Sequence, residues 1–127
     1  MSRLIEDEAT VEEAITMLKA LSEPNRLRIF ATLMSGDSCN NELGEKLDLA
    51  PNLLSHHLRA LEKAGLVHSR RDRVDGRWIY YAVDLREIER WRHWFSNFLD
   101  PARVQPRCLC GPEGEQQAQI ISLVVST

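Results

Sequence analysis

The sequence predicts a mainly helical domain that carries one small β-hairpin. Apolar residues recur every three or four positions over residues 10–64 and again over 84–99, which is the spacing of amphipathic helices. Between these segments, residues 66–83 are rich in β-branched and aromatic side chains and contain Asp75-Gly76, a dipeptide typical of hairpin turns. With 127 residues, of which 43% are hydrophobic and 28% charged, the chain fits a single globular core.

Two helices are expected at the start of the chain. Thr10 and Glu13 have the spacing of a capping box, which places the first helix over residues 10–21. Ser22 is expected to cap the second helix, with Pro24 in its first turn, where a missing N–H costs nothing. The expected inward stripe of this second helix consists of Leu27, Phe30, Ala31 and Met34.

Two short helices follow, joined by a tight link. Ser38 is expected to cap a helix over residues 39–47, and Pro51 begins another that ends at Gly65. The order is therefore helix, helix, helix, helix, strand, strand, helix, which is that of a winged helix-turn-helix. The expected inward residues of the two short helices are Leu43, Leu47, Leu54, Leu58 and Leu61.

The last helix is too apolar for the periphery of a small monomer. Asp84 is expected to cap it, and its aromatic and aliphatic residues then recur at intervals of three and four. No helix is left within the chain to cover this face, so a homodimer interface is favoured over an internal core. Residues 1–100 are expected to bind DNA and dimerise, and residues 101–127 to form a tail. The residues expected at the dimer interface are Ile15, Leu18, Ile88, Trp91, Trp94, Phe95 and Phe98.

The distribution of charge indicates a nucleic-acid partner even though the net charge is −3. Residues 51–83 carry six basic and three acidic side chains, a local charge of +3. In a winged helix-turn-helix the second helix of the pair enters the major groove, and its N-terminal half reaches base edges. Asparagine and serine suit base edges, whereas arginines suit phosphates or the minor groove. The candidate DNA contacts are Asn52, Ser55, His56, Arg59, Lys63, Arg70, Arg71, Arg73 and Arg77, whereas His57 is expected to pack inward.

Other functional classes find little support in the sequence. The apolar runs are far shorter than the roughly eighteen residues of a membrane span, and the N-terminus lacks an apolar signal core, so a cytoplasmic location without a membrane partner is expected. The chain has three cysteines, an odd number, and a reducing compartment keeps thiols free, so a structural disulfide framework is not expected. The chain has no nucleotide loop, Cys-x-x-Cys motif or acid–base pair, so neither an enzyme nor an organic cofactor is expected.

Three segments resemble the ArsR/SmtB family of small winged-helix repressors that respond to metals and metalloids. They are ALSEPNRLRIFATL at 20–33, LSHHLRALEKAGLV at 54–67 and GRWIYYAV at 76–83. The resemblance implies a cytoplasmic homodimer that binds double-stranded operator DNA near its own gene and releases it when an inducer binds. The twofold symmetry of such a dimer implies an inverted-repeat operator.

The inducer sites known in this family are incomplete here. One site lies at the start of the third helix and uses three cysteines; Cys39 matches the first, but Asn41 and Gly44 occupy the other two positions. A second site uses Asp and His on the last helix; Asp84 is present, but Asn97 stands where a later histidine is required. Neither site is therefore expected in its full form.

The three cysteines are the remaining candidates for inducer binding. Cys108 and Cys110 are separated by one residue and can turn both sulfurs onto one ion, and Cys39 completes a three-thiolate set. Thiolates select soft ions, and structural zinc prefers four ligands, so As(III) or Sb(III) fits this set best. Cadmium, lead and thiol oxidation remain alternatives, and the site lies either within one subunit or between two. More remote alternatives are a thiol oxidoreductase and a winged-helix module that binds another protein.

Overall fold

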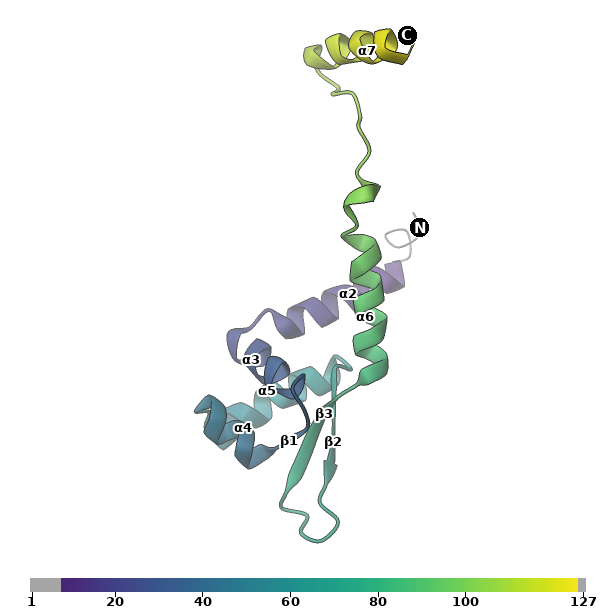
Figure 1. The fold of residues 1–127 in the computed structure, drawn as a ribbon. Coiled ribbons are helices and arrows are strands. Elements are labelled where there is room, and N and C mark those ends of the chain that lie inside the picture. Colours follow the sequence, from purple (N-terminus) through teal and green to yellow (C-terminus); the bar gives the residue numbers. More distant parts are fainter. Residues whose placement is uncertain (1–7, 126–127) are drawn as a thin grey trace.

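The computed structural model describes residues 8–125, which form helices and a three-stranded antiparallel sheet (Figure 1). The predicted fold class, mainly helical with a small hairpin in winged helix-turn-helix order, is confirmed. The elements are α2 (Glu8–Leu21), α3 (Pro24–Leu33), β1 (Ser38–Cys39), α4 (Asn40–Leu47), α5 (Pro51–Lys63), β2 (Val67–Arg71), β3 (Ile79–Val83), α6 (Leu85–Phe98), η1 (Pro101–Arg103) and α7 (Pro112–Val125).

The core lies where α3, α4 and α5 pack on one another and against the sheet. Burial of these close-packed apolar side chains stabilises the domain, and residues of α2 and α6 belong to the same cluster. The described side chains with less than 2% exposure are Ile29, Leu33, Leu43, Leu58, Leu61 and Leu66.

The inward face of α3 differs from the prediction. Leu27 and Met34, expected inside, are each 52% exposed, whereas Ile29 and Leu33 are fully buried. The helix begins one residue later than expected, because Glu23 caps it by accepting the Arg26 N–H at 2.9 Å. Of the predicted stripe, Phe30 is partly buried against the core, whereas Leu27, Ala31 and Met34 are exposed.

Residues 38 and 39 form a third strand that the sequence did not predict. In β1, Ser38 pairs with Tyr81 of β3, and β3 also pairs with β2. Ser38 is therefore not the cap of α4. Cys39 takes that place, and its Sγ accepts the N–H of Glu42 at 3.4 Å. The Oδ1 of Asn40 accepts the N–H of Ile79 at 3.2 Å, which ties the start of α4 to β3.

The C-terminal part of the chain extends away from this body. Helix α6 is capped by Asp84, as predicted, and it leads through η1 into an extended segment and then into α7, which stands apart in Figure 1. The end of the chain, which the sequence left unassigned, is thus helical up to Val125. Among the helices of residues 8–125, none combines the length and the apolar character that a membrane span requires.

Candidate nucleic-acid interface

Helix α5 separates a buried apolar face from an exposed polar face. It follows α4 after a short link in which Asp48 adopts the left-handed conformation, with φ of 53°. The inward side chains Leu54, Leu58 and Leu61 anchor the helix in the core. The candidate contacts of this helix, which are all exposed on its outer side, are Asn52, Ser55, His56, Arg59 and Lys63.

His57 belongs to the packing of α5 against α3, as expected. Its side chain is buried, and its Nδ1 lies 3.5 Å from a carboxylate oxygen of Glu23 and 3.4 Å from a guanidinium nitrogen of Arg26. The hydrogen bond from the Arg26 N–H, followed by the charge of His57, lowers the pKa of the Glu23 carboxyl. This polar cluster fixes the angle between α3 and the helix that carries the candidate base contacts.

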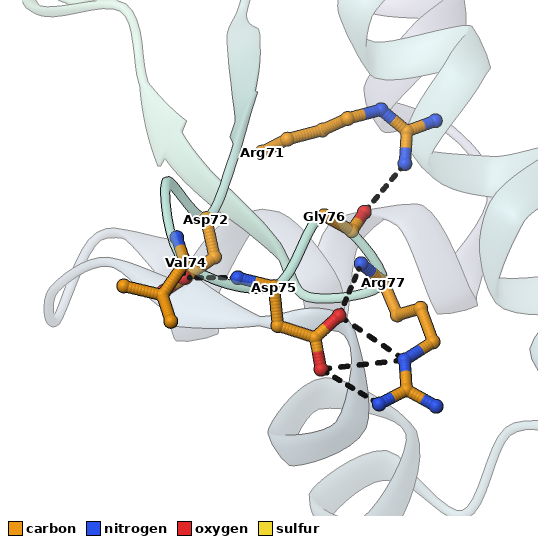
Figure 2. A network of polar contacts seen from close by, with 6 residues as sticks. All are labelled: Arg71, Asp72, Val74, Asp75, Gly76 and Arg77. Carbon is orange, nitrogen blue, oxygen red and sulfur yellow. Dashed lines mark hydrogen bonds and ion pairs between the residues drawn. The ribbon is translucent and has the colours of Figure 1, made fainter.

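The wing consists of β2, β3 and the loop over residues 72–78. The predicted hairpin is present, and Asp75 and Gly76 lie within its loop, since β2 ends at Arg71 and β3 begins at Ile79. The side chain of Asp72 organises this longer loop: its Oδ1 accepts the N–H groups of Val74 at 2.7 Å and of Asp75 at 2.9 Å (Figure 2). The chain therefore turns around a carboxylate.

The candidate arginines of the wing, Arg70, Arg71, Arg73 and Arg77, are all exposed. Figure 2 shows Arg77 directed at Asp75, with guanidinium-to-carboxylate distances of 2.8 to 3.3 Å. This contact lowers the pKa of the Asp75 carboxyl. The figure also shows the Arg71 guanidinium donating to the Gly76 carbonyl at 2.6 Å. The guanidinium carbon of Arg70 lies 4.8 Å from the centre of the Tyr80 ring.

The candidate dimer residues lie on α2 and α6, which an ion pair between Glu13 and Arg90 joins. Trp91 and Trp94 are buried within the protomer, so they belong to its own core as well as to the apolar face of α6. The Trp94 indole N–H is the one buried side-chain donor without a hydrogen-bond partner in the described residues. Of the remaining candidates, Ile15 and Leu18 are 45% and 46% exposed, and the following are partly buried: Ile88, Phe95 and Phe98.

The structure does not bring the three cysteines together in one protomer. Cys39 is buried at the start of α4, whereas Cys108 and Cys110 are exposed in the tail. No group of three His, Cys, Asp or Glu side chains suited to a metal ion occurs within residues 8–125. The tail pair has a defined local setting, because the Leu109 N–H donates to the Gln117 side chain at 3.1 Å. The Leu109 carbonyl also lies so close to Gly114 that a Cβ there would overlap it, so only glycine fits at this position.

Sequence reasoning missed two residues that shape the wing, Asp72 and Tyr80. The Tyr80 hydroxyl donates to the second carboxylate oxygen of Asp72 at 2.5 Å. The signal for Asp72 was present, since an aspartate commonly accepts the backbone N–H two residues later in a turn. Nothing in the sequence marks Tyr80, because its partner is eight residues away and meets it only through the pairing of β2 with β3.

An exposed polar helix beside a basic, two-stranded wing defines the class of winged helix-turn-helix transcriptional regulators. A model of the bacterial regulatory proteins of the arsR family matches residues 23–69. The transcriptional activator HlyU of Vibrio cholerae is 30% identical over 86 residues, which are 68% of this chain and 77% of that protein. The chain belongs to the arsR family.

The chain is also similar to a curated repressor and to a solved homodimeric domain. The arsenical resistance operon repressor of Staphylococcus xylosus is 38% identical over 61 residues, which are 48% of this chain and 59% of that protein. A homodimeric winged helix-turn-helix domain from Mycobacterium bovis has a TM-score of 0.59 at 25% identity and covers 73% of this chain and 83% of that domain.

Proposed function

We propose that this protein is a homodimeric, cytoplasmic repressor that binds operator DNA and releases it when a thiophilic ion, most favourably arsenite, binds its cysteines. One observation carries the proposal. An exposed polar face on α5 and a basic wing occur in the same chain as two exposed thiols at Cys108 and Cys110. In this proposal, residues 1–100 bind DNA and dimerise, and residues 101–127 carry the thiol pair.

The DNA-binding half of the proposal is supported by exposure and charge. Arg59, Lys63 and the wing arginines are exposed, and the inward leucines hold α5 so that Asn52 and Ser55 face outward. Binding through several basic side chains releases counterions, so the affinity for DNA should fall steeply with salt.

The inducer half of the proposal is supported by the chemistry of the thiols. Two exposed sulfurs one residue apart form a chelating pair for a soft ion, and trivalent arsenic takes three thiolates. Cys39 is the proposed third donor. Because its Sγ caps α4, binding an ion there would remove the hydrogen bond from Glu42 and disturb the start of the helix pair that binds DNA.

The geometry of the third donor decides how the site closes. Since the tail of Figure 1 extends away from α4 of its own protomer, closure requires either that the tail folds back or that it meets Cys39 of a second copy. A coupling of about 1–3 kcal/mol between the ion site and the DNA site is typical and would weaken operator binding by one or two decades.

The proposal is tested by fluorescence anisotropy of the reduced protein on DNA from upstream of its own gene. Tight, salt-sensitive binding that near-stoichiometric arsenite reverses supports it, and Cys108→Ser, Cys110→Ser and Cys39→Ser should each blunt the release. Parallel titrations with cadmium, zinc and peroxide assign the inducer if arsenite is inactive. Arsenite release that is unchanged in all three serine variants would remove the cysteines from the mechanism.

A further inference from the structure

Three of the four wing arginines have a side-chain partner within the described residues, and Arg73 has none. Arg71 holds the Gly76 carbonyl, Arg77 is paired with Asp75, and Arg70 stacks on Tyr80. The guanidinium of Arg73 has no hydrogen bond or ion pair in this part of the chain, and the residue is exposed at the tip of the wing. Arg73 is therefore the wing arginine whose charge is not already committed to the loop.

The backbone next to Arg73 is held by a single carboxylate. Asp72 accepts hydrogen bonds from the Val74 and Asp75 N–H groups through one oxygen and from the Tyr80 hydroxyl through the other. These bonds, led by that of Tyr80, lower the pKa of the Asp72 carboxyl, and the same contact raises the pKa of the Tyr80 hydroxyl. Asp72 is consequently ionised at neutral pH, and β3 anchors the loop through it.

If the wing loop faces DNA, the ionised carboxylate of Asp72 repels phosphates and weakens binding unless another effect of the same side chain offsets this. We infer that Asp72 is a positioning residue for DNA binding, which holds the wing tip so that Arg73 is presented to a backbone phosphate. Val74, which is 97% exposed, continues the presented tip. This inference rests on the proposed function, since it takes the wing to contact DNA.

Charge repulsion and loop positioning predict opposite changes in DNA affinity when Asp72 is replaced by alanine, so the direction of the change distinguishes them. If the carboxylate only repels DNA, both Asp72→Ala and Asp72→Asn bind the operator more tightly than the unchanged protein. If it positions the tip, Asp72→Ala binds several-fold more weakly although it removes a negative charge. Asp72→Asn then retains binding, because its amide oxygen still accepts the N–H groups of Val74 and Asp75 and its amide NH2 can donate to the Tyr80 hydroxyl.

The salt dependence identifies the phosphate contact that is lost. The slope of log affinity against log salt is negative. Arg73→Ala should make it less steep by about one, the effect of one phosphate contact. Asp72→Ala should reduce the steepness of this slope by a similar amount, and the double variant should reduce it no further. Arg92→Ala removes an exposed arginine of α6, remote from the wing, and serves as the matched control whose slope is expected to be unchanged.

The measurement is anisotropy on the same operator fragment at several salt concentrations, with thermal unfolding to verify that each variant folds. Tyr80→Phe provides a second variant, which keeps the ring beneath Arg70 but loses the hydroxyl, and it should weaken binding in the same direction as Asp72→Ala. Equal or tighter binding by Asp72→Ala, with an unchanged slope, would overturn the inference alone. Failure of the unchanged protein to bind any upstream fragment would overturn the proposed function as well.

Discussion

Glu23 is the residue at which helix capping, charge and interhelical packing meet. Its carboxylate caps α3 and lies beside the buried His57 of α5. The lowered pKa of Glu23 means that the ionised form is stabilised by folding. A carboxyl of this kind contributes stability above its unfolded-state pKa and loses that contribution as the pH falls through its folded-state pKa.

Replacing Glu23 by Gln should therefore lower the melting temperature at neutral pH and have a diminishing effect in acid. The difference from the unchanged protein should begin to shrink as the pH falls below the ordinary glutamate pKa of 4.5, and it should disappear only below the lowered folded-state pKa, where the native carboxyl also becomes neutral. Thermal unfolding monitored by circular dichroism at a series of pH values measures this, with Glu42→Gln as the control. A difference that stays constant down to strongly acidic pH would show that the charge of Glu23 is not involved.

At the scale of one element, α5 combines the two roles that the fold requires of it. Leu58 is 1% exposed in the core, whereas Asn52 is exposed on the opposite face. Because the two faces do not overlap, stability and DNA binding should respond to different residues of the same helix.

Leu58→Ala should cost about 2–5 kcal/mol of unfolding free energy, since it leaves a cavity among tightly packed leucines. Asn52→Ala should leave stability within roughly 0.5 kcal/mol of its original value and weaken binding to the specific operator more than to unrelated DNA. Urea denaturation and competition anisotropy on the two variants give both quantities. A loss of stability in Asn52→Ala as large as that of Leu58→Ala would contradict the division of the helix into two faces.

The elements also differ in how far local sequence determines them. Helices α5 and α6 were predicted correctly because their start signals and apolar stripes lie within the helices themselves. In α3 the cap was misplaced by one residue, and three of the four residues expected inside are exposed, because which face is buried depends on how α3 packs against α5 and the sheet. Strand β1 escaped prediction because its two residues gain their conformation from pairing with β3, about forty positions further along the chain.

The candidate sites follow the same rule. The exposure of the candidate DNA contacts was predictable from charge and helix position, and α5 exposes every one of its candidates. The division of labour among the wing arginines was not, since it depends on side chains such as Asp75 that meet them only in the folded loop. For the cysteines the sequence supplied the ligand types but not their separation, which depends on where the tail runs.

At the scale of the whole molecule, the candidate DNA interface and the two tail thiols lie toward opposite ends of α6 (Figure 1). The wing and α5 lie toward the start of that helix, and the tail with its thiols leaves from its end. An influence of the tail on DNA binding therefore requires that the tail folds back onto its own protomer, that it contacts a second copy, or that it acts through the body of the dimer. Both proposals therefore depend on whether α2 and α6 form the dimer interface.

The exposed apolar residues of α2 provide the test of dimerisation. Leu18→Glu places a charge on a surface that is 46% exposed in one protomer, where it is tolerated, but desolvates that charge if the surface is covered by a second copy. We expect dimer dissociation to become at least tenfold more favourable, about 1.4 kcal/mol, and two-site binding to an inverted repeat to weaken accordingly. Sedimentation velocity over a concentration series measures the first effect. Leu27→Glu, at a residue of α3 that is 52% exposed, is the matched control. Equal dissociation of the two variants would place the interface elsewhere than at this surface of α2.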